Sequence, residues 1–356
     1  MSACTCSPIA GGHPDGGFIP VQSDWTQADW LGALAVRLNV GRMDYRVAPG
    51  LYAAGRPDAA APVFVTANYK LSFDHLRRAL RGLDAWLLVL DTHGVNVWCA
   101  AGKGTFSTAE LNRQIEVTGL SKVVSHRRLI LPQLGAVGVA AHAVAQATGF
   151  TVIYGPVRAG DIPAWLNAGR RKDSAMRTVR FSFWDRLVLV PVEIVNGRTH
   201  LLTLAAVALV LALIRVRGFD PPLASSFAGY ATLLLGSALA ACIFLPLLLP
   251  WLPTRSFSIK GATIGLILTA CLAVLAPAYA GSGFWAVYQG GWAIAGSALA
   301  AGAIAAFVGL NFTGATVFTS QSGTLLETKR ALPVIAGAAF GGLALQIIGA
   351  FCNNPS

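Results

Sequence analysis

The sequence predicts an α/β domain, with a mostly parallel sheet and helices on both faces, followed by an all-α domain of five transmembrane helices. The first observation behind this fold class is the distribution of charge. From Asn196 onward the chain of 356 residues holds only 7 of its 27 Lys and Arg and 2 of its 16 Asp and Glu. Before that point, apolar runs of strand length alternate with helical segments, a pattern typical of parallel sheets with crossover helices. After it, five apolar runs approach the length of about 20 residues that a membrane-spanning helix needs.

The N-terminal segment, residues 1–60, is rich in Gly, Pro and Asp and contains one stretch with helical spacing, SDWTQADWLGALAVRLN at 23–39. Its start has neither the basic region nor the apolar core of a secretory signal, so we expect this half of the chain to stay in the cytoplasm. Cysteines there would remain reduced. Cys4 and Cys6 lack the two-residue spacing of a zinc knuckle. We interpret them as tail thiols or as a transient site for a soft cation, and assign them no role.

The α/β domain is expected at residues 61–170. Ser107 and Glu110 predict a capping box at the start of one helix, and Gly119 and Gly149 predict the ends of two helices. Extended runs and helices alternate along the domain, as they do in βαβ units. The predicted strands are 63–67, 85–92, 122–125, 128–133 and 150–156, and the predicted helices are 72–83, 107–119, 136–149 and 161–169.

Ligands of such sheets bind beyond the carboxyl ends of the strands. This rule places four loops of the domain at one rim of the sheet, and we expect the functional site there. The loops are Thr66–Tyr69, Asp91–Lys103, Ser125–Arg128 and Tyr154–Arg158.

A basic juxtamembrane linker is predicted at 171–198 and the transmembrane domain at 199–356. The net charge of +11 divides into +6 before Asn196 and +5 after it, and the basic residues gather at the domain boundary, as in Arg170–Lys172, and between the apolar runs. That pattern is typical of topology signals and not of a nucleic-acid interface, and it places the N-terminus inside and the C-terminus outside. No Asp, Glu, Lys or Arg lies within the five runs, which favours an anchor and assembly platform over a transporter. The runs are Thr199–Ile214, Leu223–Leu245, Gly261–Ala280, Trp285–Leu310 and Ala331–Phe351.

The stretch NVWCAAGKGT, residues 96–105, is similar in outline to a phosphate-binding loop. It does not meet the Walker A pattern, because Val97 stands where the first glycine is required and Gly104 stands where Ser or Thr is required. A second glycine pair, Gly135 and Gly138, matches a fragment of a dinucleotide-binding fingerprint, and helix packing explains it equally well. Neither motif predicts a phosphate site.

Cys99 is the strongest candidate for chemistry in that stretch. It follows the carboxyl end of a predicted strand, and the small residues Ala100–Gly102 beside it allow a large, flat group to approach the backbone. Trp98 offers an apolar wall, and Lys103 adds a cation that favours a thiolate. The residues alone leave open whether Cys99 is a reactive or ligating thiol or a structural, buried one.

His93 is a weaker candidate. Asp91-x-His93 matches the beginning of D-x-H-x-x-G, the motif by which many cobalamin enzymes ligate cobalt through histidine, but Asn96 replaces the required glycine.

Five strings together resemble the HgcA family, the corrinoid proteins of bacterial and archaeal mercury methylation. They are VTANYK (65–70), LDT (90–92), NVWCAAGK (96–103), HRRLILPQLG (126–135) and YGPVR (154–158). Residues 62–168 are also similar to the corrinoid domain of the large subunit of the corrinoid iron–sulfur protein of the acetyl-CoA pathway. That relative has no membrane half and no cysteine at the position of Cys99. The resemblance to the mercury family extends from about residue 60 to the C-terminus.

The resemblance implies a membrane-bound corrinoid methyltransferase of anaerobic metabolism, located in the cell inner membrane. Its cofactor would be cobalamin or a related corrinoid in the base-off form, with Cys99 presented by a short cap helix as the catalytic lower axial ligand of the metal, cobalt. A thiolate would donate soft electron density that favours release of a methyl group to Hg(II). The implied corrinoid-binding residues are Thr66, Asn68, Asn96, Val97, Trp98, Cys99, Ala100, Ala101, Gly102, Lys103, Ser125, Leu131, Gln133, Gly135, Tyr154, Gly155, Pro156 and Arg158.

The implied partners are an HgcB-type ferredoxin with two [4Fe–4S] clusters as reductant, a methyl-donor protein or methyl-folate, the substrate Hg(II) and the lipid bilayer, with no nucleic acid. Two other functions remain open from the sequence. One is a corrinoid methyl carrier of one-carbon metabolism, in the acetyl-CoA pathway, and the other is a non-enzymatic cobalamin-binding membrane protein.

Overall fold

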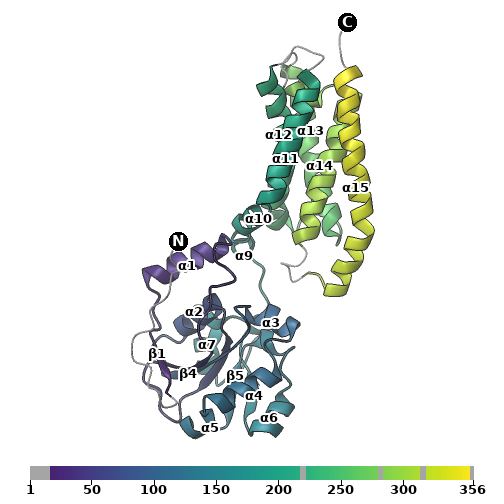
Figure 1. Cartoon of the computed structure of the whole chain (residues 1–356). Coiled ribbons are helices and arrows are strands. Elements are labelled where there is room, and N and C mark those ends of the chain that lie inside the picture. Colours follow the sequence, from purple (N-terminus) through teal and green to yellow (C-terminus); the bar gives the residue numbers. More distant parts are fainter. Residues whose placement is uncertain (1–16, 217–221, 280–283, 313–317, 353–356) are drawn as a thin grey trace. The chain divides into compact units, whose positions relative to one another are not determined.

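The computed structural model describes residues 17–216, 222–279, 284–312 and 318–352. Cys4 and Cys6 lie outside these residues. The chain divides into two compact units, Met1–Arg180 and Phe181–Ser356, which are described separately. The first unit has an α/β fold built on a mixed sheet, and the second unit contains the long apolar helices (Figure 1).

The first unit is built on a six-stranded sheet with the order β1-β2-β4-β3-β5-β6. All neighbouring strands are parallel except β2 and β4, which pair antiparallel. The predicted fold class, a mostly parallel sheet followed by an all-α domain, is confirmed. The strands are β1 (Ile19–Val21), β2 (Gly50–Ala54), β3 (Val63–Ala67), β4 (Ala85–Leu90), β5 (Arg128–Leu131) and β6 (Thr151–Tyr154).

Helices cover both faces of the sheet because successive side chains of each central strand point to opposite faces and both sets are apolar. Val63 and Val65 pack in one core with residues of α3, α4 and α6, whereas Phe64 packs in a second core with residues of α2 and α7. The helices of this unit are α1 (Gln27–Arg37), α2 (Lys70–Ala79), α3 (Val97–Lys103), α4 (Thr108–Val117), α5 (Leu120–Val123), α6 (Ala141–Thr148), α7 (Ile162–Asn167) and α8 (Ser174–Arg177).

The N-terminal segment is part of the sheet, contrary to its predicted role as a separate loop-rich region. Both β1 and β2 come from residues 1–60, and β2 pairs with the central strand β4 along its whole length. The sequence GLYAA of β2 contains no β-branched residue and begins after a proline, so its pattern is a weak strand signal. The helix predicted within 23–39 is confirmed as α1.

A buried network of four charges joins α1 to α2. Lys70 lies 2.7 Å from Asp74, Arg77 lies 2.7 Å from Asp29, and the pairs Lys70–Asp29 and Arg77–Asp74 close the square. Burial alone would raise the pKa of Asp29, but hydrogen bonds from Lys70, from the Thr26 backbone, from Arg77 and from the Thr26 hydroxyl outweigh it and hold that pKa well below its usual range. Since a buried charge without its partner is strongly destabilising, the network fixes α1 on α2.

Two local predictions in this unit are wrong. Residues 122–125 do not extend: α5 occupies Leu120–Val123, and the strand starts only at Arg128. The capping box of α4 is half formed, because Ser107 Oγ accepts from the Glu110 backbone while the Glu110 carboxylate binds elsewhere. The predicted helix ends are confirmed, since Gly119 and Gly149 both have positive φ.

Among its described residues, the second unit contains five helices that are long and apolar enough to span a membrane, as predicted. Two of them approach closely at glycines: a Cβ on Gly261 would lie 2.1 Å from the backbone oxygen of Ala305, and one on Gly265 would lie 2.3 Å from that of Ala301. The predicted linker, 171–198, contains α8 and two further helices, α9 (Phe183–Leu187) and α10 (Val190–Asn196). The long helices are α11 (Arg198–Val216), α12 (Leu223–Leu248), α13 (Phe257–Leu275), α14 (Gly291–Phe312) and α15 (Gln321–Cys352).

Ionisable residues lie within these helices, because the helices extend beyond the predicted runs. Lys260 in α13 donates to the backbone oxygens of Leu249 (2.7 Å) and Leu252 (3.0 Å), just past the end of α12. Glu327 in α15 accepts from the backbone N–H of Ser258 at 2.8 Å and from serine hydroxyls at the start of α13. Both groups thus connect helix ends, where orphan backbone groups need partners.

Candidate functional site

The loop after β4 leads directly into α3, the helix that carries Cys99. Asn96 is its N-cap, and the Asn96 Oδ1 accepts from the Cys99 backbone N–H at 3.0 Å. Gly104 ends the helix in the left-handed conformation, with φ of 79°. The Cys99 side chain is exposed. The sequence therefore forms one short, capped helix whose first turn presents a thiol at the carboxyl edge of the sheet.

The two faces of α3 differ in kind. Ala100 and Ala101 are buried in the core of the domain, so their small size serves packing and not the approach of a ligand. Gly138 lies close to this part of the chain, because a Cβ on Gly138 would lie 2.0 Å from the Phe106 backbone oxygen and 3.1 Å from the Ala101 Cα. Both alanines therefore face the core and not the outward side of the helix, and close packing against Phe106 explains the glycine pair Gly135 and Gly138.

The outward face of α3 is formed by Trp98, Cys99, Gly102 and Lys103. Trp98 is 42% exposed, and Gly102 and Lys103 are exposed. Residues three and four apart share a helix face, so Gly102 and Lys103 lie beside Cys99. A Cβ on Gly102 would have no neighbour within 4 Å. The thiol thus shares its helix face with the open position at Gly102 and with Lys103, and the exposed indole of Trp98 precedes it in the chain.

Asn68, at the end of β3, holds the loop that precedes α3. Its Oδ1 accepts from the backbone N–H of Thr92 (3.1 Å) and of Gly94 (2.9 Å), and its Nδ2 donates to Asp91 Oδ1 (3.0 Å). Asn68 is 2% exposed. Because all these contacts are made to the loop, the amide is committed to positioning it.

Glu110 of α4 holds the same loop from the other side. Its Oε1 accepts from the Asp91 backbone N–H at 2.8 Å, and its carboxylate forms two hydrogen bonds with Arg113. Burial would raise the pKa of Glu110, but the hydrogen bonds from Arg113, Gln114 and the Asp91 backbone outweigh it, so that pKa is lowered. A charged Glu110 therefore anchors the entrance to α3.

The ends of β5 and β6 are joined by Lys172, a residue that the sequence placed in a membrane anchor. Its Nζ donates to Gln133 Oε1 and to the backbone oxygen of Tyr154 at 2.8 Å. The Tyr154 hydroxyl donates to the Val139 backbone oxygen at 2.7 Å, and the Gly155 N–H donates to the Leu131 oxygen at 2.8 Å. Burial, together with the charge of Arg177, lowers the pKa of Lys172.

The structure brings most of the predicted site residues to the carboxyl edge but not Ser125. Ser125 precedes β5 and donates to the Ala59 backbone oxygen, at the amino end of β3. Its predicted place depended on the strand at 122–125, which is helical. Of the others, Thr66, Leu131, Gly135, Gly155 and Pro156 are buried, Val97 packs against the core, and Arg158 is exposed.

His93 lies on the exposed part of the loop, in the left-handed conformation with φ of 56°. Its Nδ1 is 3.5 Å from Asp91 Oδ1. Across the described ranges no group of three or more His, Cys, Asp or Glu side chains is arranged to hold a metal ion. The side chains that sequence reasoning missed, Lys172 and Glu110, act over 17 to 39 residues of separation, which no local motif reveals.

Comparisons with known proteins concern this α/β unit. Residues 32–166 match the family model described as CO dehydrogenase/acetyl-CoA synthase delta subunit. Acetyl-CoA decarbonylase/synthase complex subunit gamma of Archaeoglobus fulgidus is 34% identical over 144 residues, which cover 38% of this chain and 30% of that protein. The subunit of the same name from Methanopyrus kandleri is 35% identical over 127 residues, covering 35% of this chain and 27% of that protein.

The chain therefore matches less than a third of the length of these relatives. The similarity agrees with the resemblance of residues 62–168 to the large subunit of the acetyl-CoA pathway protein. A domain similar to the CO dehydrogenase/acetyl-CoA synthase delta subunit, followed by five helices long enough to span a membrane, is what the sequence and the structure establish.

Proposed function

We propose that the chain is a membrane-bound corrinoid methyltransferase that would transfer a methyl group to Hg(II), with the Cys99 thiolate as the residue that would hold the cobalt of the corrinoid. The observation that carries the proposal is the exposed thiol on α3, at the carboxyl edge of a domain that is similar to subunits of acetyl-CoA decarbonylase/synthase complexes. The finer assignment, to the HgcA family, rests on the string NVWCAAGK followed by five apolar helices.

The residues at this edge fit a large, flat cofactor. The open space at Gly102 leaves room beside the Cys99 thiol, and the exposed indole of Trp98 offers an apolar surface next to it. A thiolate is a soft ligand suited to a late transition metal. A bound corrinoid would supply a cobalt centre that takes up and releases a methyl group.

The protein's own contribution would be to orient the sulfur and to tune the metal. Asn96 caps the first turn of α3 through the Cys99 N–H, and Asn68 and Glu110 hold the preceding loop, so the backbone that carries the thiol is held in place before a ligand binds. Electron density from the Cys99 sulfur would favour departure of the methyl group toward an electrophile such as Hg(II). Gln133 and Tyr154, fixed by Lys172, would border the cofactor from the neighbouring strands.

A second function is favoured by the names of the relatives: a methyl carrier within the acetyl-CoA pathway. The gamma subunits of Archaeoglobus fulgidus and Methanopyrus kandleri belong, by name, to acetyl-CoA decarbonylase/synthase complexes. In that case the methyl acceptor would be another subunit and not mercury.

The decisive experiment uses the full-length protein purified anaerobically and loaded with a corrinoid. We expect Cys99→Ala to change the absorption spectrum of the bound corrinoid and to abolish most methylmercury formation. Cys271→Ala is the matched control, because Cys271 is also exposed but lies in α13. An unchanged spectrum and full activity in Cys99→Ala would refute the ligand role. Methyl transfer to an acetyl-CoA synthase subunit, with none to mercury, would establish the second function instead.

We also propose that the α/β unit lies in the cytoplasm, where an HgcB-type ferredoxin and a methyl donor would reach Cys99. The basic residues at the unit boundary support this orientation. A membrane-impermeant maleimide should label Cys99 in inverted membrane vesicles and not in intact cells. Labelling in intact cells alone would reverse the proposed topology.

A further inference from the structure

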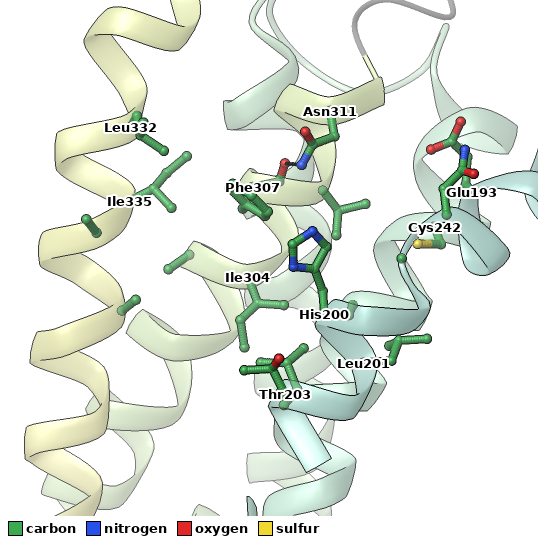
Figure 2. A pocket seen from close by; sticks show the side chains of 18 residues that line it. Glu193, His200, Leu201, Thr203, Cys242, Ile304, Phe307, Asn311, Leu332 and Ile335 are labelled. Atoms are coloured by element: carbon green, nitrogen blue, oxygen red, sulfur yellow. Dashed lines mark hydrogen bonds between the residues drawn. The ribbon is translucent and has the colours of Figure 1, made fainter. Parts of the chain in front are cut away.

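The membrane unit contains a pocket of about 610 Å³ between α10, α11, α12, α14 and α15 (Figure 2). Binding sites for small molecules range from about 300 to 1,000 Å³, so this volume suits one compact ligand. The pocket is separate from the Cys99 site, since all of its lining residues lie between Glu193 and Ala339.

The pocket changes character along its length. Figure 2 shows His200 near its middle, with Asn311 and Glu193 above and Ile304 and Thr203 below. Further aliphatic side chains of α11, α14 and α15 line the rest of the space. A ligand that fills it would therefore need a polar head and an apolar body.

The charged residues of the lining disfavour a ligand with an anionic head group. Glu193 is the acidic residue among the lining residues, and neither Lys nor Arg lines the pocket. An anionic head, such as a phosphate or a carboxylate, would enter a site of low dielectric beside a carboxylate and without a cation. An uncharged head that forms hydrogen bonds is compatible with the lining.

The shape of the lining selects a ring. The imidazole of His200 meets the phenyl ring of Phe307 edge to face, with a centroid distance of 5.7 Å and an interplanar angle of 84°. Such a corner offers a face for a flat ring and ring nitrogens for its oxygen atoms. His200 and Thr203 line the pocket and are both exposed, so the pocket reaches the surface of this unit.

We propose that this pocket binds a membrane quinone, an uncharged ring with oxygen substituents on an apolar isoprenoid tail. The ring would lie against Phe307, with an oxygen hydrogen-bonded to His200, and the tail would extend along Ile304 and Ile335. The site gives the membrane unit a ligand of its own, independent of the chemistry proposed for Cys99.

The test uses the full-length chain in nanodiscs of quinone-free phosphatidylcholine, with heptyl-hydroxyquinoline N-oxide, a fluorescent quinone analogue, as the probe. We expect saturable quenching of the probe and its displacement by menaquinone. Ala339→Phe fills the pocket and should weaken binding at least about tenfold. His200→Phe keeps a ring of similar shape and removes the nitrogens, and should weaken binding about threefold to tenfold through loss of one hydrogen bond.

Val334→Phe is the matched control, because Val334 is on the same helix, is 70% exposed and does not line the pocket. It should bind the probe like the unaltered protein. Binding of the probe by Ala339→Phe as tight as by the unaltered protein would overturn the proposal. Displacement of the probe by a long-chain alcohol as effectively as by menaquinone would also overturn it, because the pocket would then be a general groove for lipid chains. His200→Phe keeps the test independent of any effect that the larger side chain in Ala339→Phe has on folding.

Discussion

Replacing Asn68 by alanine should release the loop that presents Cys99 without altering Cys99 itself. The amide of Asn68 accepts from the backbone N–H groups of Thr92 and Gly94 and from the Thr92 hydroxyl, and it donates one hydrogen bond to Asp91. Thr92 and Gly94 are buried, so water does not readily replace the lost acceptor. The structure therefore predicts a local effect with a definite magnitude.

Each buried N–H that loses its partner costs about 1–3 kcal/mol, so two of them cost about 2–6 kcal/mol. Partial relaxation of the loop would bring the loss to about 3 kcal/mol, which corresponds to a roughly hundredfold increase in the opening equilibrium. Amide hydrogen exchange measures this directly, because the exchange rate of a protected N–H follows the free energy of local opening.

In hydrogen-exchange mass spectrometry of the full-length protein, peptides that cover residues 91–96 should exchange about 100-fold faster in Asn68→Ala than in the unaltered chain. Peptides from β6 should change little. Asn167→Ala, the same chemical change at an exposed position at the end of α7, serves as the control. If exchange at 91–96 stays within a factor of about three, Asn68 does not hold the loop and the argument for a preset thiol fails.

Three further predictions test the surrounding structure. Gly138→Ala should destabilise the α/β unit by about 1–3 kcal/mol, because the new Cβ would lie 2.0 Å from the Phe106 oxygen. Gly102→Ala should have little effect, because a Cβ there has no neighbour within 4 Å. Thermal unfolding compares the two variants, and equal melting temperatures would contradict the close packing at Gly138. Asp29→Asn should cost about 3–5 kcal/mol at neutral pH. Since the folded-state pKa of Asp29 is lowered, its carboxylate stabilises the folded protein above the ordinary pKa of 3.8, and this stabilisation is lost as pH falls below that value. In acid the unaltered protein should therefore be no more stable than Asp29→Asn. Unfolding followed by tryptophan fluorescence would measure the difference. Glu327→Gln should lower the melting temperature of the membrane unit by weakening its bonds to the serines at the start of α13, and an unchanged melting temperature would show that this contact is dispensable.

Much of the fold could be predicted because its signals are local. The membrane helices follow from composition, and α4 is capped by Ser107 and followed by Gly119 as capping rules require. Short segments were less reliable: KVVS at 122–125 contains two β-branched valines, but its first two residues belong to α5, the helical turn after Gly119. Four residues carry too little periodicity to separate the two structures.

The candidate site was predictable in position and not in detail. Cys99 could be placed at the edge of the sheet because it follows the run of β4. That Ala101 faces the core could not be predicted, because Gly138, which lies close to it in the folded unit, is far along the chain. The bonds of Lys172 to the ends of β5 and β6 likewise arise only in the folded unit.

The exposure of Cys99 separates its chemistry from the folding of the domain. Its side chain contributes nothing to the buried core, and the helix around it is held by the Asn96 cap and by the packing of Ala100 and Ala101. A single substitution at this position can therefore replace the atom offered to a ligand without a compensating change elsewhere. Such a position lets one scaffold acquire different metal-ligand chemistries by single mutational steps, with stability imposing little selection on which residue is retained.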